Sequence, residues 1–391
     1  MASPISSSLA RQLQERFRER QQQIIALVRG LVEAESPSGD ETGSRKVVEL
    51  LAAAAEESSC VNSIERVNVP EFGQHLVIRA FQAKADLGNI LVVGHTDTVH
   101  SRGSLAERPW RVEANRIYGP GIFDMKANCA LAIGVLHALD DLSIVPGYGV
   151  TLALTCDEEV GSFSGWPLLE KLVQSSKTRC GLVLEPPAVG GKVKTGRKGT
   201  GIFEMKVEGL AAHAGLEPQK GASAILEIAK QIERLHAMNN AGGGINVNVG
   251  VVQGGTRSNV VAAEASAEID VRFSTAEEAG EVEEALRNSR PFDERARITV
   301  TGGINRPPME RTKKVLGLYD LARTLAQSLE FELGEAQVGG ASDGNFLAAA
   351  GVSVLDGLGI DGDGAHAPHE HILIDDIPRR GALLAGLIAS L

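Results

Sequence analysis

The stretch Ile-Leu-Val-Val-Gly-His-Thr-Asp-Thr-Val at residues 90–99 decides the fold that we expect. Its four leading apolar residues, 90–93, are typical of a strand that is buried on both faces of a sheet. His95 and Asp97 follow where such a strand leaves the sheet, which is where open α/β sheets carry their active sites. Taken alone, this pair fits a purely structural histidine and carboxylate equally well.

Length and composition predict a globular protein of two domains, because 391 residues exceed one ordinary core and 43% of them are hydrophobic. The 50 acidic and 39 basic residues give a net charge of −11, so neither nucleic acid nor an anionic membrane is an expected partner. The four cysteines form no Cys-x-x-Cys pair, which argues against a thiolate zinc site. Without a signal peptide or a membrane-spanning run, the sequence favours a cytoplasmic protein.

Helical and strand patterns alternate in the first half of the chain. This alternation predicts an α/β domain with a mainly parallel sheet and helices on both faces. We expect helices over residues 8–34, 40–55 and 128–139 and strands over residues 76–80, 90–93, 150–155 and 181–184.

After residue 197 the order becomes strand, helix, strand, strand, helix, strand, which predicts an inserted α+β domain of the split β-α-β, ferredoxin-like type. We therefore expect a discontinuous catalytic domain of residues 1–197 and 308–391 and a lid or dimerisation domain of residues 198–307. The elements expected after residue 197 are strands over 199–209, 245–252, 262–273, 297–301 and 352–355, helices over 221–238, 276–288, 312–328 and 378–391, and a loop over 239–244.

Acidic residues follow two of the predicted strands of the first half. Glu158 and Glu159 come after the strand at 150–155, and Glu185 comes after the next one. Adjacent acids repel one another, so a cation or proton partner is the natural reason to place them together. Asp124 precedes a predicted helix, and a helix cap is an equal alternative for it.

A late loop adds three histidines at 366, 369 and 371, and by itself such a loop is often a solvated turn. Two imidazoles with three carboxylates suit Zn²⁺, or Co²⁺ or Mn²⁺, better than the all-oxygen shells of Ca²⁺ and Mg²⁺ or the sulfur ligands of Cu⁺. A bridging Asp124 would give each of two ions one histidine, one further carboxylate and a place for water. The predicted ligands are His95, Asp124, Glu159, Glu185 and one late histidine.

Two more carboxylates have predicted roles beside these ligands. Glu158 cannot easily share the shell of its neighbour Glu159, so it is free to act as the general base that passes a proton from water to the leaving amine. Asp97 is placed to fix the tautomer of His95. Serine hydrolysis is not indicated, because Gly-Ser-Phe-Ser-Gly at 161–165 lacks the central serine of Gly-x-Ser-x-Gly.

Five motifs along nearly the whole chain resemble those of the dizinc amidohydrolases, a family that includes glutamate carboxypeptidase, aminoacylase, acetylornithine deacetylase and succinyl-diaminopimelate desuccinylase. They are His-Thr-Asp-Thr-Val (95–99), Gly-Pro-Gly-Ile-Phe-Asp-Met-Lys (119–126), Asp-Glu-Glu-Val-Gly-Ser (157–162), Leu-Glu-Pro (184–186) and His-Ala-Pro-His-Glu (366–370). The resemblance implies two zinc ions, one held by His95 and Glu185 and the other by Glu159 and His366, with Asp124 between them. It also implies a cis peptide bond after Asp124.

The resemblance extends to the inserted domain. His213 resembles the lid histidine that helps to stabilise the oxyanion, in some members from the partner subunit, which implies a homodimer through the lid domain. Asn259 resembles a substrate-binding asparagine, although Ala262 stands where the family commonly has proline. Arg306 resembles the arginine that pairs with the substrate's terminal carboxylate, a bidentate role that suits a guanidinium. A surface salt bridge is the alternative for Arg306.

The motif spellings look most like the glutamate carboxypeptidase branch, which implies release of a C-terminal amino acid from a peptide or an N-acyl amino acid. Deacylation of N-acyl amino acids, as in acetylornithine deacetylase and aminoacylase, is the alternative. A non-catalytic metal-binding module of the same fold is more distant, because it would be expected to have lost the base or a ligand and the sequence retains both.

Overall fold

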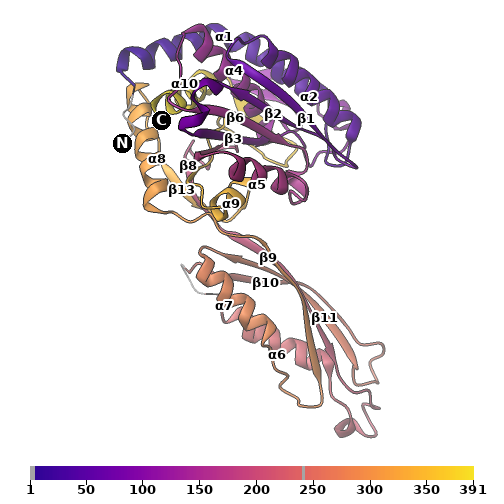
Figure 1. The fold of residues 1–391 in the computed structure, drawn as a ribbon. Helices are drawn as coiled ribbons and strands as arrows, with labels where there is room; N and C mark the ends of the chain where they lie inside the picture. The colour runs from indigo at the N-terminus through magenta and orange to yellow at the C-terminus, as the bar shows by residue number, and fades with distance from the viewer. Residues whose placement is uncertain (1–4, 240–242) are drawn as a thin grey trace. The chain divides into compact units, whose positions relative to one another are not determined.

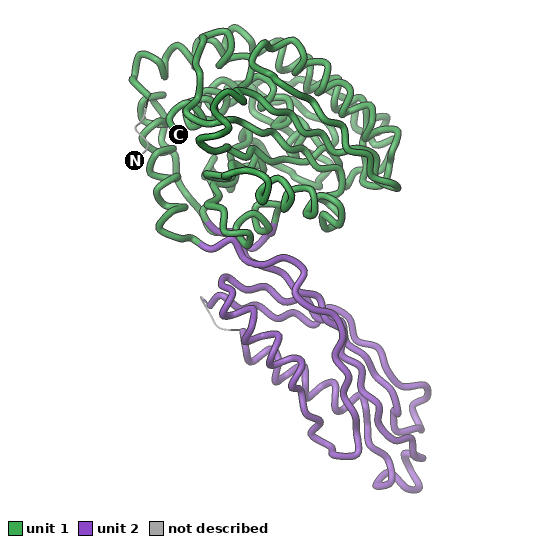
Figure 2. Tube along the Cα trace, viewed as in Figure 1, with its two compact units in different colours: residues 1–195, 311–337, 342–391 green, residues 196–310, 338–341 purple. Residues whose placement is uncertain are grey.

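The computed structural model describes residues 5–239 and 243–391, so the middle of the loop predicted over 239–244 lies outside the described residues. The chain divides into two compact units (Figure 2). Unit 1 comprises residues 1–195, 311–337 and 342–391, and unit 2 comprises residues 196–310 and 338–341. A role of unit 2 as lid or dimerisation domain stays a prediction.

Unit 1 is organised around a six-stranded sheet in the order β1-β2-β6-β3-β7-β14. The four strands from β6 to β14 run parallel to one another, whereas β1 and β2 are antiparallel additions at one edge, so the predicted mainly parallel sheet is confirmed. The strands are β1 (Val61–Val69), β2 (Gly73–Ala80), β3 (Asn89–His95), β6 (Gly149–Thr155), β7 (Thr178–Val183) and β14 (Val354–Leu355).

Helices cover both faces of this sheet, as predicted (Figure 1). One face carries α1 (Ser7–Glu33), α2 (Glu41–Glu56), α4 (Ala127–Asp141) and α10 (Asp376–Ser390), and the other carries α5 (Gly165–Ser175) and α9 (Asp343–Ala349). A further helix, α8 (Lys313–Ser328), packs against α10. One described helical segment, Ile122–Asp141, is long and apolar enough to cross a membrane, but 89% of its most apolar window is buried inside the fold.

The central strand β3 has the character that its sequence predicts, since all seven of its residues are buried. Gly94 allows close packing, because a Cβ there would lie 2.8 Å from the Met125 Cε atom and would displace that side chain. Asp40 caps α2 by accepting a hydrogen bond from the Gly43 amide. The stretch 100–115 holds α3 (Ser104–Glu107) and β4 (Arg111–Glu113).

Unit 2 is a four-stranded antiparallel sheet in the order β10-β11-β9-β12, with two helices packed on it. The predicted strand and helix order is confirmed. Its elements are β9 (Gly199–Glu208), α6 (Ala224–His236), β10 (Asn246–Gly254), β11 (Glu264–Phe273), α7 (Ala276–Arg287) and β12 (Arg297–Arg306). At the base of the insertion, Arg197 and Met309 exchange both backbone hydrogen bonds, each 3.0 Å long.

Candidate active site

Three neighbouring parallel strands place the predicted polar residues together at their carboxyl ends, on one side of the unit 1 sheet. His95 is the last residue of β3, and it lies opposite Thr155 at the end of β6. Glu158 and Glu159 form the short turn that follows β6, and Glu185 comes two residues after β7. Because β6, β3 and β7 are adjacent and parallel, their carboxyl ends meet at the same edge.

The side chains at this edge form two groups that share Asp124. In the first group, His95 Nε2 lies 3.1 Å from Asp124 Oδ1 and 3.7 Å from Glu185 Oε1. In the second, His366 Nε2 lies 3.3 Å from Asp124 Oδ2 and 3.2 Å from Glu159 Oε2. Within each group the possible ligand atoms all lie within 4.8 Å of one another. The structure thus brings all five predicted ligands together, and each oxygen of Asp124 faces a different histidine.

Asp124 does not cap the helix that follows it, so the helix-cap alternative is wrong. The N-cap position of α4 is Lys126, which makes no side-chain capping bond. Asp124 sits instead in a tight segment, Ile122–Lys126, that enters from Gly121 with φ of +70°. A Cβ at Gly121 would lie 2.3 Å from Thr98 Cγ2, so only glycine fits there. The peptide bond between Asp124 and Met125 is cis, as the resemblance implies.

The site has an excess of negative charge in the absence of a metal. Hydrogen bonds to Asp124 and Glu159 raise the pKa of His366 to about 10. Burial acts to lower the pKa of His95, but its contacts with Asp124 and Asp97 outweigh burial and hold that pKa well above its usual value. Burial likewise acts to raise the pKa of Asp124, and the two histidines outweigh it and lower that pKa. The Asp124 carboxylate therefore remains ionised between the two imidazoles.

The nitrogen and oxygen atoms of the two groups are better suited to bind divalent cations than to satisfy one another by hydrogen bonds. Glu159 Oε1 is buried and has no hydrogen-bond partner in the described chain, which is a costly arrangement for a carboxylate oxygen unless a cation binds it. The set offers only imidazole nitrogens and carboxylate oxygens, the ligands that Zn²⁺ and its neighbours accept. The residues present thus fit a pair of transition-metal ions.

Asp97 supports this edge in a way that the sequence does not reveal. The nearest partner of His95 Nδ1 is the backbone oxygen of Asp97 at 3.0 Å, and the Asp97 carboxylate is more distant at 3.4 Å. That carboxylate accepts hydrogen bonds from the amides of Glu158 and Glu159, both at 3.2 Å, and from the Ser38 hydroxyl at 2.6 Å. Asp97 therefore positions the turn that carries Glu158 and Glu159 as well as the ring of His95.

The three predicted substrate-contacting residues all belong to unit 2. His213 is exposed, and its Nδ1 atom accepts hydrogen bonds from the amides of Gly215 and Leu216. Asn259 is also exposed, and its backbone oxygen accepts a hydrogen bond from the Ala214 amide. Arg306 ends β12 and is only 6% exposed, so an ordinary surface salt bridge does not describe it.

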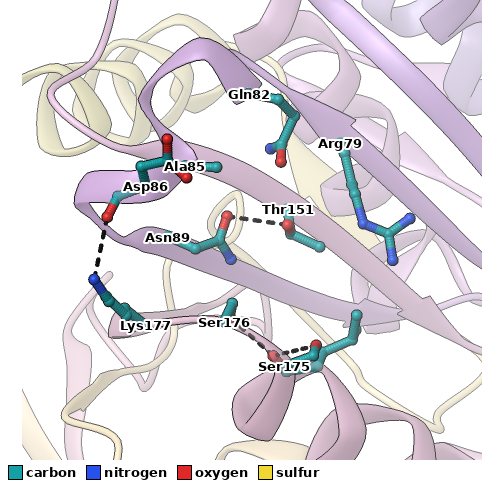
Figure 3. A pocket seen from close by; sticks show the side chains of 10 residues that line it. Arg79, Gln82, Ala85, Asp86, Asn89, Thr151, Ser175, Ser176 and Lys177 are labelled. Carbon is teal, nitrogen blue, oxygen red and sulfur yellow. Dashed lines mark hydrogen bonds between the residues drawn. The ribbon is translucent and has the colours of Figure 1, made fainter.

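A concavity of about 360 Å³ lies at the end of β3 opposite to His95, where Asn89 begins the strand (Figure 3). Among its lining residues, Thr151 Oγ1 donates a 3.0 Å hydrogen bond to Asn89 Oδ1. Arg79, Lys177 and Asp86 also line it, and its lining includes neither histidine nor cysteine. This pocket therefore lacks the ligand set found at the other end of the sheet.

The cysteines of unit 1 should be chemically inert in the folded protein. Burial raises the pKa of Cys129 and of Cys180 to about 12 and that of Cys60 to about 11, and it also raises the pKa of Cys156. At pH 8 only about 10⁻⁴ to 10⁻³ of such thiols are ionised, and the thiolate is the reactive form. We expect iodoacetamide at pH 8 to leave native protein unmodified and to label all four cysteines in urea, as mass spectrometry would show. Rapid labelling of Cys129 in the native protein would contradict its burial.

Together, the fold and the two groups of ligands define a two-unit α/β protein with a candidate dinuclear metal centre. Residues 91–390 match the model of peptidase family M20/M25/M40, and the chain belongs to this family. It is thus a hydrolase of a metal-dependent peptidase family.

Three similar proteins illustrate the relationship. Carboxypeptidase G2 from Pseudomonas sp. (strain RS-16) is 30% identical over 310 residues, which cover 78% of this chain and 74% of the relative. The crystal structure of aminopeptidase PepT from Bacillus cereus ATCC 10987 matches with a TM-score of 0.79 at 20% identity, covering 95% of this chain and 98% of that one. The Bacillus subtilis YXEP protein matches with a TM-score of 0.70 at 16% identity, covering 95% and 98%. At these identities the two structures show the shared fold.

Proposed function

We propose that this protein is a dinuclear zinc amide hydrolase that releases a C-terminal amino acid from a peptide or an N-acyl amino acid. The observation that carries the proposal is the position of Asp124, whose two oxygens face His95 and His366 separately. One ion would be held by His95, Asp124 and Glu185 and the other by Asp124, Glu159 and His366. Bound there, two such ions would supply an activated water and positive charge for the developing oxyanion.

The remaining steps belong to side chains of the chain itself. Glu158 accepts a proton from the attacking water and passes it to the leaving nitrogen. Asp97 fixes the backbone of that base through its bond to the Glu158 amide. In unit 2, we assign oxyanion stabilisation to His213 and substrate binding to Asn259 and Arg306, with Arg306 taking the terminal carboxylate.

Several observations support the particular form of this proposal. The relative that is 30% identical is named a carboxypeptidase, and the Bacillus subtilis structure is described as a dinuclear metal-binding peptidase.

We also propose a homodimer formed through unit 2, where Ile202, Ile225 and Leu226 are 63%, 46% and 57% exposed. A cytoplasmic setting is supported by the four cysteines, all of which are free thiols.

Metal removal tests the proposal directly. Chelation is expected to abolish hydrolysis of a panel of dipeptides and N-acyl amino acids, and two equivalents of Zn²⁺ per chain are expected to restore it, because the water and the oxyanion both depend on the ions. Co²⁺ and Mn²⁺ should restore activity to different degrees. Metal content by mass spectrometry and product release by chromatography provide the measurements.

The same panel separates the carboxypeptidase from the deacylase. A carboxypeptidase should require one particular C-terminal residue and tolerate many acyl or peptidyl groups before it. A deacylase should require a small acyl group and tolerate many amino acids after it. Substrates esterified at the terminal carboxylate serve as the control for Arg306 and should be poor. Full hydrolysis by protein that retains no metal would contradict the proposed function.

A further inference from the structure

The Glu370 carboxylate accepts four hydrogen bonds beside the candidate metal centre, and it is 2% exposed. Its Oε2 atom accepts from His100 Nε2 at 2.6 Å and from the Gly121 amide at 2.7 Å. Its Oε1 atom accepts from the Phe123 amide at 2.9 Å and from the Asp124 amide at 3.0 Å. Four donors thus converge on one buried side chain, and three of them belong to the segment that carries Asp124.

The proton positions around Glu370 follow from chemistry. His100 Nδ1 faces both terminal nitrogens of Arg108 at 3.3 Å. Because a guanidinium has donors and no acceptor, His100 Nδ1 must accept, and the ring proton therefore lies on Nε2. His100 then donates to Glu370, so all four groups around this side chain are donors, and a side chain with two acceptor oxygens satisfies them.

Glu370 also belongs to the loop that carries His366, four residues earlier. This loop is tightly held, since a Cβ at Gly364 would lie 3.0 Å from the Glu370 backbone. His366 itself has a positive φ of 64°, which a non-glycine residue adopts only when its surroundings impose it. One carboxylate therefore joins the backbone of Asp124, shared by both groups of ligands, to the loop of His366.

We propose that Glu370 is a positioning residue for the metal centre, holding Asp124 and His366 at the separation at which one carboxylate serves two ions. The inference rests on the proposed function. Glu370 touches neither substrate nor metal in this role and acts through the Asp124 backbone. Such supporting residues behind metal ligands are commonly worth 10- to 100-fold in metal affinity.

The test is the Glu370→Gln variant, which keeps the shape of the side chain and replaces one acceptor oxygen by a donor NH₂ group. The NH₂ group would face the Gly121 amide or His100 Nε2. Because both of these groups are themselves donors, no hydrogen bond could form between them and the NH₂ group. We expect Zn²⁺ affinity, measured by calorimetry on the metal-free protein, to fall by about 10- to 100-fold. The absorption spectrum of the Co²⁺-loaded protein should change as well, because the geometry of the ligands is disturbed.

Glu227→Gln is the matched control. Glu227 is also 2% exposed, and its carboxylate accepts from the Phe292 and Asp293 amides and from Gln231 Nε2, but it lies in unit 2. Its loss should lower the unfolding temperature and leave Zn²⁺ affinity and the Co²⁺ spectrum unchanged.

The outcomes are distinct. A folded Glu370→Gln variant that binds two ions as the unmodified protein does, or a Glu227→Gln variant with the same loss of metal affinity, would overturn the positioning role. If Glu370→Gln does not fold, Glu370→Asp replaces it with the same expectation, because the shorter side chain cannot reach all four donors. Unmodified protein that binds no divalent cation would instead overturn the proposed function itself.

Discussion

The Glu158→Gln variant is expected to retain both metal ions and to lose about 10²- to 10⁴-fold in kcat, the usual contribution of a general base. Glutamine has nearly the same shape as glutamate but cannot accept the proton from water. The Glu158 amide would still bond to the Asp97 carboxylate, so the turn that carries Glu159 should be undisturbed. Steady-state kinetics and metal analysis on the same preparation measure both expectations. KM should change little, because the lost interaction acts in the transition state.

Glu170→Gln provides the matched control for charge removal. Glu170 lies on α5 in the same unit, and it is exposed. This variant should match the unmodified protein in kcat and in metal content. Undiminished hydrolysis by Glu158→Gln would mean that another group takes the proton, and the proposed mechanism would then be wrong.

The Asp124→Asn variant is expected to lose both ions rather than one. An asparagine offers one oxygen and no charge where the carboxylate offers an oxygen to each histidine-containing group. We expect Zn²⁺ affinity at both positions to fall by at least about 100-fold, which exceeds the usual effect of residues behind the ligands. Activity at micromolar Zn²⁺ should fall to the level of chelated protein.

Comparison with the flanking histidines makes the Asp124 result specific. His95→Ala and His366→Ala should each lose one ion, because each histidine belongs to one group only. Asp140→Asn is the control, since Asp140 accepts three hydrogen bonds from Ser58 and Ser59 at the far end of α4 and should retain both ions when changed. One retained equivalent of Zn²⁺ in Asp124→Asn would show that the aspartate is not shared.

The parallel core and the position of its polar residues could be predicted because they depend on local sequence. The apolar run before His95 specifies a buried strand wherever it lies in the chain. In contrast, β1 has polar residues at most positions and is held by its pairing with β2, so its sequence carries no comparable signal. The helix α5 was missed for a similar reason. It starts where the Asp157 carboxylate accepts from the Ser164 and Gly165 amides, and this contact exists only in the folded chain.

The supporting contacts of the site could not be predicted from sequence. The bond from the Gly121 amide to Glu370 spans 249 residues, and no local pattern around either residue specifies it. Asp97 was expected behind His95 because the two are close in sequence, yet its carboxylate bonds chiefly to amides about 61 residues away. Local patterns thus identify the ligand types, and only the tertiary structure shows what holds them.

The backbone pairing of Arg197 with Met309 has a consequence for how proteins with this inserted domain could evolve. The two ends of the insertion lie one strand spacing apart, about 4.8 Å. A different inserted domain with ends at this separation could therefore replace unit 2 without a change in the backbone of unit 1. The residues to which we assign substrate contacts, His213, Asn259 and Arg306, all lie in unit 2, whereas all five candidate metal ligands lie in unit 1. Recombination at this junction could therefore vary substrate preference while the metal chemistry is inherited unchanged.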